Sequence, residues 1–471
     1  MSIFITSTRN KNSNHLLSDM IVMKFGGTSV ANAEAIKRTI EIVRSRLDKK
    51  PIVVVSALAK VTDALYSISN AAENCNLGDA SDIIEKLRQR HFDLVYELLG
   101  DTASHKEALD KLKVEFDELQ KLVKAVTVLG ELTPRIKARI ISKGELLSSI
   151  IIGHALEASG ISTRWLDARR FVITNDDYLQ ADPLIPEIER RTPAEIDKAF
   201  SSGCNAVITQ GFVATTPEGE STVLGRGGSD YSASLIGMAV SASAIEIWTD
   251  VDGVKSADPR RVANTRSLSR ISFEEAAEMA HFGAKVLHPL TIEPAVMKNI
   301  PVYVLNSLNP ENGGTEIVNH DAVEDGVKSI SFKEGIVLMN IFSPRMINIS
   351  GFLMKVFDIF AKNKVSVDLI STSEANISLT INDSKSLDAV CAALSEIAEV
   401  RVFNDKSQLS IIGKNVVKQR SLINWAVSSL KGTNVYMISQ AASSDNISFV
   451  IDRNRLDEVL QEFHTYLFEY K

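Results

Sequence analysis

This chain of 471 residues has few cysteines, no long apolar run and no excess of positive charge. Its three cysteines, Cys75, Cys204 and Cys391, lie far apart without metal-ligand spacing, which indicates reduced thiols in an intracellular protein. No apolar run is long enough to span a membrane. The formal net charge of −7 argues against a nucleic-acid binder, so local positive groups have to hold any acidic substrate. We therefore expect a cytoplasmic protein with no nucleic-acid or membrane partner.

The rest of the composition is that of an ordinary globular protein, with 45% hydrophobic and 24% charged residues. A chain of this length is too long to fold around one compact core, and we expect about two to four domains. Residues 1–20 are polar and lack the apolar segment of a signal peptide. We interpret them as a loosely ordered N-terminal extension.

Short apolar runs alternate with helical patterns over residues 21–325. The runs are rich in valine and isoleucine without strict polar alternation, which is typical of strands buried on both faces. The alternation predicts a three-layer α/β/α domain with a mainly parallel central sheet. A nearly all-helical stretch at about 81–159 predicts an insertion that covers one mouth of the sheet. The expected strands are Ile21–Phe25, Ile52–Ala57, Thr163–Asp167, Ala206–Gly211, Ile245–Thr249 and Val302–Asn306, and the expected helices between them are Ala31–Asp48, Asp230–Ser243, Phe273–Phe282 and Ile292–Lys298.

After residue 330 a pattern of helix, two strands and a second helix occurs twice. One copy begins with the helical pattern Phe352–Lys362, and the other begins with Leu422–Leu430. Repetition at this scale is rarely accidental and predicts tandem small α+β modules. We place the first module at 330–405 and the second at 406–471.

The most informative local pattern is Lys24-Phe25-Gly26-Gly27-Thr28-Ser29, where a predicted strand ends and a helical pattern follows. Paired glycines at such a turn expose backbone N–H groups in front of a helix N-terminus, which favours an anion such as phosphate. Lys24 adds a full positive charge beside them, although a surface lysine at a strand end is the plainer alternative. Neither Gly-x4-Gly-Lys-Ser/Thr nor Gly-x-Gly-x-x-Gly after a strand occurs, so the scaffold is a different one.

A second glycine-rich segment, Gly225-Arg226-Gly227-Gly228-Ser229-Asp230, precedes another helical pattern. A helix cap at Ser229 or Asp230 explains one residue of the six. Three glycines around an arginine indicate a close backbone approach to a ligand, with a guanidinium available for a carboxylate or a phosphate.

These two segments begin a longer series of motifs. Trp248-Thr249-Asp250, Asp258-Pro259-Arg260 and Phe282–Pro289 follow them along the chain. In order and spacing the series resembles the aspartate kinases of the amino-acid-kinase superfamily. The C-terminal repeat resembles the tandem, ferredoxin-like ACT domains that follow the catalytic domain in that family. The resemblance covers nearly everything after residue 20.

The resemblance implies transfer of the ATP γ-phosphoryl group to the side-chain carboxylate of L-aspartate. The product would be 4-phospho-L-aspartate, at the first step of lysine, threonine and methionine biosynthesis. A carboxylate is already ionised at neutral pH and needs no general base, so positioning and charge neutralisation would carry the catalysis. Mg²⁺ is expected to arrive with ATP, with no metal ligand directly from the protein.

The resemblance also implies roles for individual residues. Lys24 would neutralise the transferring phosphoryl group, Arg226 would hold the α-carboxylate of aspartate, and Glu145 would hold its α-ammonium. The plainer alternatives are a helix-surface charge for Glu145, a strand-end cap for Asp250 and a solvated lysine for Lys285. The expected catalytic residues are Lys24, Asp230 and Lys285. The expected substrate contacts are Thr62, Glu145, Arg226 and Ser229, and the expected ATP contacts are Lys24, Gly26, Gly27, Thr249, Asp250, Arg260 and Lys285.

In the first module the resemblance extends to the effector site of lysine-sensitive aspartate kinases. A strand-to-helix turn at Gly351 offers N–H groups to a carboxylate, while Asp368 and Glu374 can pair with ammonium groups. Many apolar residues here, Phe352 and Leu353 included, can equally belong to the module's core. We expect L-lysine as the effector, and the expected contacts are Met346, Gly351, Phe352, Leu353, Ser366, Val367, Asp368, Ser373 and Glu374.

Two other functions stay open at this point. One is a different amino-acid kinase, acting on glutamate, acetylglutamate or a nucleoside monophosphate, and the later motifs and the ACT pair argue against it. The other is a catalytically silent amino-acid sensor, against which the intact Lys24, Glu145 and Arg226 argue. The family pattern further implies a homodimer or a higher homo-oligomer assembled through the ACT modules.

Overall fold

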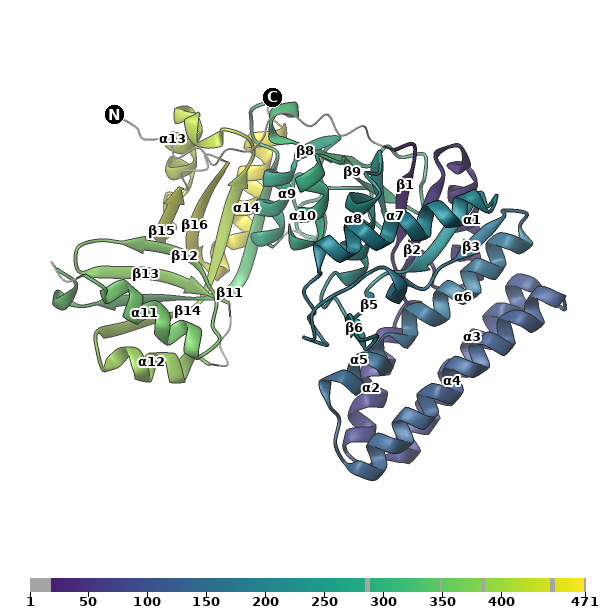
Figure 1. Ribbon diagram of the computed structural model, residues 1–471. Coiled ribbons are helices and arrows are strands. Elements are labelled where there is room, and N and C mark those ends of the chain that lie inside the picture. Colours follow the sequence, from purple (N-terminus) through teal and green to yellow (C-terminus); the bar gives the residue numbers. More distant parts are fainter. Residues whose placement is uncertain (1–17, 284–288, 348–349, 383–385, 441–444, 470–471) are drawn as a thin grey trace. The chain divides into compact units, whose positions relative to one another are not determined.

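The structure of the chain is a computed structural model that describes residues 18–283, 289–347, 350–382, 386–440 and 445–469. The chain folds into two compact units (Figure 1). The first unit comprises Met1–Gly253 and Leu290–Asn319, and the second comprises Val254–Pro289 and His320–Lys471. Each unit has its own sheet and its own core.

Seven strands of the first unit lie side by side in the order β3-β4-β2-β1-β7-β9-β10. Neighbouring strands are parallel except for the pair β9 and β10. The mainly parallel sheet predicted from the sequence is thereby confirmed. The strands are β1 (Ile21–Phe25), β2 (Pro51–Val55), β3 (Thr163–Trp165), β4 (Ala206–Gln210), β7 (Ala244–Thr249), β9 (Val302–Asn306) and β10 (Thr315–Val318).

Helices connect these strands, and most of them follow the expected patterns. The hairpin of two short strands, strand β10, the helix after β2 and the helix before β4 were not predicted from the sequence. The helices are α1 (Ala33–Arg44), α2 (Val61–Glu73), α3 (Leu77–Leu99), α4 (Ala103–Leu129), α5 (Pro134–Ile141), α6 (Lys143–Ala158), α7 (Ile185–Ser201), α8 (Gly228–Ala239) and α10 (Pro289–Lys298), and the hairpin consists of β5 (Val213–Thr215) and β6 (Ser221–Val223).

Alternate residues of β1 serve opposite faces of the sheet, as the two-residue period of a strand requires. Met23 and Phe25 belong to a core cluster that contains residues of α1, α2 and α6. Val22 points to the other face, where it lies under Gly237 of α8, close enough that a Cβ at Gly237 would be 3.7 Å away. Lys24 shares this second face. Because Lys24 is two residues after Val22, its side chain points to the same face of the sheet, toward α8.

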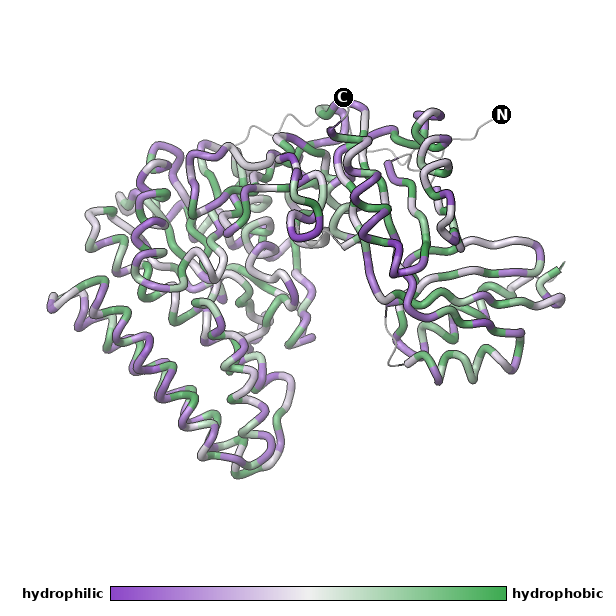
Figure 2. The backbone as a smooth tube through the Cα atoms, turned by 180° about the vertical axis from the view of Figure 1, so that it is seen from behind, coloured by the Kyte–Doolittle hydropathy of each residue, from purple (hydrophilic) through white to green (hydrophobic). Residues whose placement is uncertain are grey.

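The all-helical stretch forms α3 to α6, and α3 and α4 make a long antiparallel hairpin (Figure 1). Figure 2 shows hydrophilic and hydrophobic residues alternating along both of these helices, as expected for amphipathic helices that bury one stripe. On that stripe Leu112, Phe116 and Leu119 of α4 are fully buried. The insertion thus extends the core of the unit instead of forming a separate one. No helix in the described part of the chain is long and apolar enough to cross a membrane.

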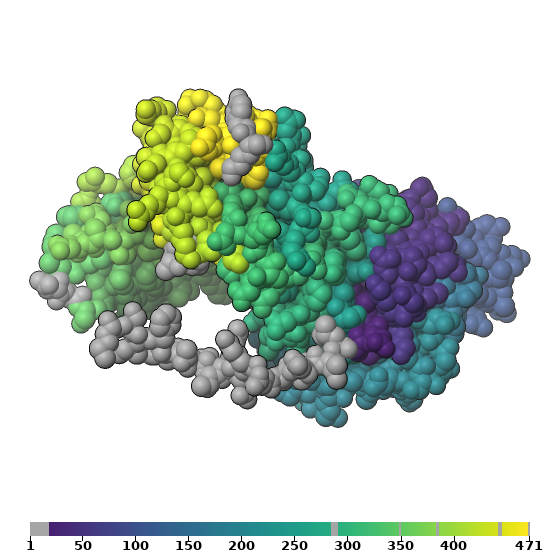
Figure 3. All heavy atoms as spheres, turned by 90° about the horizontal axis from the view of Figure 1, so that it is seen from above, coloured from purple at the N-terminus to yellow at the C-terminus, as the bar shows by residue number. Residues whose placement is uncertain are grey.

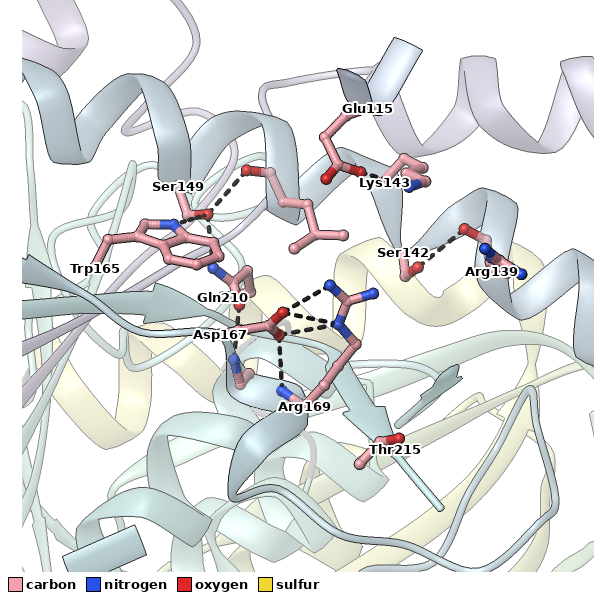
Figure 4. A network of polar contacts seen from close by, with 12 residues as sticks. Glu115, Arg139, Ser142, Lys143, Ser149, Trp165, Asp167, Arg169, Gln210 and Thr215 are labelled. Atoms are coloured by element: carbon pink, nitrogen blue, oxygen red, sulfur yellow. Dashed lines mark hydrogen bonds and ion pairs between the residues drawn. The ribbon is translucent and has the colours of Figure 1, made fainter. Parts of the chain in front are cut away.

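A buried lysine ties the helical hairpin to α6. The Nζ of Lys143 lies 2.5 Å from a carboxylate oxygen of Glu115 and 2.6 Å from one of Glu118, both on α4. The Lys143 side chain is only 2% exposed, and Arg139 also pairs with Glu118. Figure 4 shows Lys143 pointing at Glu115 from the first turn of α6. Because Glu145 is two residues further along the same helix, the cluster fixes the turn that carries it.

The second unit contains a six-stranded antiparallel sheet in the order β12-β13-β11-β14-β16-β15. Two separate core clusters lie along it, one for each copy of the repeat. In the space-filling view of Figure 3 the last module, yellow-green to yellow, is closely packed. The tandem α+β modules are confirmed. The elements are β8 (Arg270–Ser272), α9 (Phe273–His281), β11 (Ser329–Phe342), α11 (Phe352–Lys362), β12 (Val367–Thr372), β13 (Asn376–Ile381), α12 (Leu387–Ser395), β14 (Glu399–Ile412), α13 (Arg420–Ser429), β15 (Val435–Gln440), β16 (Asn446–Asp452) and α14 (Leu456–His464).

Helix α9 is packed as part of this second unit. Glu275 closes a capping box with Ser272 at the start of the helix, and its second oxygen accepts a hydrogen bond of 2.8 Å from the backbone N–H of Lys414. Glu278 accepts a hydrogen bond of 2.6 Å from Asn446 of β16. A helix that precedes the repeat in sequence is therefore fastened to the last module.

The Lys143 cluster generates a first prediction. Lys143→Met leaves the carboxylates of Glu115 and Glu118 facing each other without their common cation. We expect the free energy of unfolding to fall by about 3 kcal/mol, the lower end of what breaking a buried ion pair costs, because both carboxylates keep some contact with water. Lys113→Met is the matched control, since Lys113 pairs with Asp110 on the exposed surface of α4. Urea unfolding of both variants gives the comparison, and equal losses would contradict the role of Lys143.

Candidate active site

A cavity of about 610 Å³ opens at the carboxyl ends of β1, β2 and β4. Backbone hydrogen bonds continue past the strand ends here, since Ser56 donates to Phe25 at 3.1 Å and Gly211 donates to Val55 at 2.9 Å. Ligands of open parallel sheets bind at this edge, because the loops that follow the strands converge there. Six residues predicted from the sequence line the cavity together: Lys24, Thr62, Glu145, Arg226, Ser229 and Asp230.

Lys24 and Asp230 form an ion pair on one wall of the cavity. The distance from Nζ of Lys24 to Oδ1 of Asp230 is 2.7 Å, and the two side chains are 11% and 19% exposed. Lys24 comes from β1 and Asp230 from the first turn of α8, so the pair joins the sheet to that helix. A pair this close to a cavity holds the ammonium at a defined point while leaving it within reach of a further anion.

Glu145 is buried in the floor of the cavity. Burial away from water raises the pKa of its carboxyl from 4.5 to about 8, and backbone hydrogen bonds and the charge of Lys24 only partly oppose this. Its Oε2 has no hydrogen-bond partner within the described part of the chain. An unsatisfied buried carboxyl oxygen is costly, so its presence at a cavity indicates a cationic or hydrogen-bond-donating ligand.

The glycine-rich loop before α8 brings backbone close to the cavity. Gly227 caps α8 with φ +71, a left-handed conformation that favours glycine, and no side chain caps the helix. A Cβ on Gly228 would lie 2.6 Å from the ring of Phe212, so a larger residue does not fit there. The first N–H groups of α8 therefore face a cavity and not a capping side chain. Arg226 lines the same cavity and is exposed, with no ion pair to any described residue.

One turn after Glu145, hydrogen bonds of Ser149 hold α6 against the sheet (Figure 4). Ser149 of α6 accepts hydrogen bonds from Trp165 at 3.0 Å and from the amide of Gln210 at 2.8 Å. The other end of the Gln210 side chain accepts a hydrogen bond of 2.8 Å from the backbone N–H of Ala168. Gln210 is the last residue of β4, so this network fixes the distance between α6 and the carboxyl edge of the sheet.

The residues expected on the nucleotide side are only partly placed. Gly26 donates a hydrogen bond of 3.1 Å to the carbonyl of Trp248, which brings the glycine turn beside Thr249 and Asp250 at the ends of β1 and β7. A Cβ on Gly27 would lie 3.0 Å from the carbonyl oxygen of Ala57, which accounts for glycine at this position. Arg260 belongs to the second unit, where it pairs with Asp258. Lys285 lies outside the described residues, so its placement stays a prediction.

Several residues that line the cavity were not predicted from the sequence. Phe212 lies in the short connection between β4 and β5 with φ +64, a strained conformation for a residue with a side chain, and such residues often mark functional sites. Its place after a predicted strand is the signal that could have identified it. Tyr66, Lys137 and Gln180 come from α2, α5 and a loop, and no motif in the sequence marks them.

The residues expected to bind an effector belong to the first repeat of the second unit. Gly351, with φ +87, caps α11, and no side chain caps this helix. Phe352 is buried in the module's core, and Ser373 and Glu374 are exposed. Asp368 is already paired within the chain: its Oδ2 lies 3.2 Å from Nζ of Lys333, and its Oδ1 lies 4.0 Å from His281 of α9. The Asp368 side chain is only 9% exposed.

Comparisons with known proteins agree with this organisation. The sequence model of the amino acid kinase family matches residues 19–306, and that of the ACT domain matches residues 339–396 and 409–467. The lysine-sensitive aspartokinase 3 of Escherichia coli K12 is 34% identical over 466 residues, covering 96% of this chain and all of that protein.

Two crystal structures of E. coli aspartokinase III are similar over the whole chain. One contains lysine and aspartate in the T-state and covers 96% of this chain and all of that chain, with a TM-score of 0.80 and 32% identity. The other contains aspartate and ADP in the R-state and covers 95% of this chain and all of that chain, with the same score and identity.

The buried carboxyl predicts a pH-dependent stability in the absence of ligand. The unfolded chain returns Glu145 to a pKa near 4.5, whereas the folded value is about 8. Between these values the folded state binds the extra proton, so the free energy of unfolding falls as the pH rises and levels off above pH 8. In urea unfolding between pH 5 and 9, Glu145→Gln should show a slope shallower by up to about 1.4 kcal/mol per pH unit. Identical slopes would contradict the raised pKa.

Proposed function

This chain belongs to the amino acid kinase family as an ATP-dependent aspartokinase regulated through ACT domains, and from that premise we propose how its cavity carries out the reaction. L-Aspartate binds in the cavity lined by Lys24, Glu145 and Arg226 and presents its side-chain carboxylate to the γ-phosphoryl group of ATP. The observation that carries this proposal is the buried Oε2 of Glu145, which lacks a partner among the described residues.

The ammonium of aspartate fits the place that Glu145 leaves open. Ionised Glu145 is unfavourable in its buried position, and a cation held against it removes most of that cost. Arg226 reaches the same cavity from the glycine-rich loop and offers a fork of donors that matches a carboxylate. Thr62 and Ser229 line the walls between them and supply hydroxyl groups to the bound substrate. The α-ammonium and the α-carboxylate of an amino acid thus each meet a group of opposite charge in the cavity.

Phosphoryl transfer to a carboxylate requires charge neutralisation more than proton transfer. The nucleophile is ionised at neutral pH, and the barrier arises largely from bringing two anions together. Lys24 projects into the cavity from β1, held by Asp230, and is placed to compensate charge on the transferring group. The N–H groups at Gly27 and at the start of α8 add fixed dipoles of the same sign, whereas the N–H of Gly26 is already bonded to the carbonyl of Trp248.

The nucleotide binds along the ends of β1 and β7. Gly26, Gly27, Thr249 and Asp250 lie together there, and Arg260 and Lys285 are the further contacts that we propose. Mg²⁺ arrives on the ATP phosphates, as is usual for nucleotide substrates. No group of three acidic, histidine or cysteine side chains suited to a metal gathers within the described part of the chain. Asp230 is the acidic residue at the phosphoryl end, where it can orient Lys24 or a water bound to the ion.

L-Lysine is the effector that we propose for the first ACT module. One related crystal structure contains lysine, and the N–H groups at Gly351 suit its carboxylate. The chain's own Lys333 ammonium already sits at Asp368, the residue expected to bind an ammonium of the effector. The effector would therefore compete with Lys333 for Asp368, and this exchange would loosen the contact of Asp368 with its surroundings on α9.

We further propose that the protein is cytoplasmic and assembles into a homodimer or a higher homo-oligomer through its ACT modules. The edge strands β12 and β15 expose Ile370 and Ile438, 45% and 47% exposed. Exposed apolar side chains such as these are suited to burial against a second copy of the chain. The three cysteines are free, which fits a reducing compartment.

The catalytic role of Lys24 is tested by activity. The wild type should release ADP from Mg·ATP only when L-aspartate is added, and hydroxylamine should trap the acyl phosphate. Lys24→Met should lower kcat about a hundredfold or more, because the charge acts mainly on the transition state. Lys37→Met, on the exposed side of α1, serves as the control and should retain full activity.

Three results would contradict this proposal. Absence of aspartate-dependent turnover in the wild type would refute the proposed substrate, and turnover with glutamate or acetylglutamate instead would favour another amino-acid kinase. Near-normal kcat in a folded Lys24→Met variant would refute the role of the lysine.

The effector proposal is tested by inhibition with L-lysine. Asp368→Asn removes the charge that holds an ammonium and should raise the half-inhibitory concentration at least tenfold, since a lost charged pair is worth about 1.4 kcal/mol or more. Lys333→Met removes the internal competitor and should lower that concentration. Lys362→Met, exposed on α11, is the control. An unchanged response of Asp368→Asn would place the effector elsewhere, and a raised value for Lys333→Met would show that Lys333 supports the site.

A further inference from the structure

Lys137 lines the substrate cavity, and nothing in the motif series assigns it a function. It lies on the short helix α5, which packs against α2 on one side and against β6 on the other. Arg135, on the same helix, pairs with Glu220 near β6 at 2.8 Å. Helix α5 is therefore held between the wall that carries Thr62 and the strand that leads into Arg226.

The ammonium of Lys137 has an aromatic neighbour but no carboxylate neighbour among the described residues. Its Nζ lies 5.5 Å from the centre of the Tyr66 ring, a cation–π arrangement. Tyr66 lines the same cavity, and burial followed by the nearby Glu145 charge raises the pKa of its hydroxyl, so the ring stays neutral. Tyr66 thus positions a full positive charge at the cavity without neutralising it.

Counting the charges around the cavity shows what this ammonium adds. The charged lining residues are Lys24, Lys137, Arg226, Glu145 and Asp230. Lys24 and Asp230 pair with each other, which leaves two cations and the carboxyl of Glu145 for a ligand. Aspartate carries two carboxylates and one ammonium. Lys24, held by Asp230, faces the reacting side-chain carboxylate, and Glu145 faces the ammonium, so Arg226 and Lys137 are the two cations that remain for the α-carboxylate.

We propose that Lys137 is a second carboxylate-binding residue, which holds the α-carboxylate of the substrate together with Arg226. This inference rests on the proposed function and names a specificity determinant of the same cavity. The side-chain carboxylate has to face Lys24 and the phosphoryl group, so the α-carboxylate is the one that remains for the two cations near β6. The flexible four-carbon stem of lysine lets Nζ reach from the Tyr66 ring to the substrate.

The role predicts a separation of KM from kcat. The α-carboxylate does not react, so its ion pair with Lys137 is equally strong in the ground state and in the transition state. Lys137→Met should therefore raise KM for L-aspartate about tenfold, as expected for one charge-assisted hydrogen bond, and leave kcat within about twofold. Lys137→Arg keeps the charge and should restore KM to within about threefold of the wild type.

A substrate analogue identifies which carboxylate Lys137 contacts. The α-amide of L-aspartate keeps the reacting side-chain carboxylate and lacks the α-carboxylate charge. Wild type and Lys137→Met should use this amide with kcat/KM values within about twofold of each other, because the partner of Lys137 is absent. Lys121→Met, on the exposed surface of α4, is the matched control and should behave as the wild type with both substrates. Urea unfolding of each variant verifies that it is folded.

The outcomes are distinct. An unchanged KM in Lys137→Met, a fall in kcat alone, or the same loss with aspartate and with the amide would each overturn the inference while leaving the aspartokinase reaction intact. Absence of aspartate-dependent turnover in the wild type would overturn the proposed function, and this inference with it.

Discussion

The burial of one carboxyl group, that of Glu145, is the constraint on which the substrate cavity depends. A carboxylate removed from water is unfavourable, and burial raises its pKa to about 8. The folded state tolerates this unfavourable burial because polar contacts hold the helix that carries Glu145 in place. The same desolvation makes the site selective, since a bound ammonium regains far more free energy against a buried carboxylate than against an exposed one.

Two groups of polar contacts hold that helix. The Lys143 cluster fastens the first turn of α6 to the helical hairpin, and the contacts of Ser149 with Gln210 fasten its second turn to the sheet (Figure 4). Together they explain why a long helical insertion belongs to a catalytic unit. The insertion supplies Lys143's partners on α4 and carries α5, from which Lys137 faces the cavity.

The second unit contains more than the regulatory modules. The match to the amino acid kinase family extends to residue 306, yet Val254–Pro289 is part of the compact unit that contains the ACT repeat. This segment includes Arg260, one of the proposed nucleotide contacts, and α9, whose His281 lies near Asp368. One residue proposed for ATP and the residues proposed for the effector therefore share one unit, which offers a physical route for an effector to influence nucleotide binding.

Much of the fold and part of the site could be predicted from the sequence, because they depend on local pattern. Buried strands appear as valine-rich and isoleucine-rich runs, and glycines with a lysine or an arginine mark the turns where backbone approaches a ligand. Lys24, Arg226 and Asp230 could be named in this way, whereas Glu145 was named only through the resemblance to a family. Lys137 and Tyr66 could not, because they lie on different helices whose residues follow ordinary amphipathic patterns, and only packing brings them to one cavity.

Local sequence pattern is enough to predict the parallel sheet, the repeated modules and the chemistry of the glycine-rich turns, since periodicity and backbone requirements act over a few residues. The electrostatics of the site, by contrast, depend on the folded chain. The shifted pKa of Glu145, the pairing of Lys24 with Asp230 and the pairing of Asp368 with Lys333 arise from burial and from neighbours distant in sequence. Solvent exclusion and charge proximity are properties of the folded chain, so no local pattern encodes them.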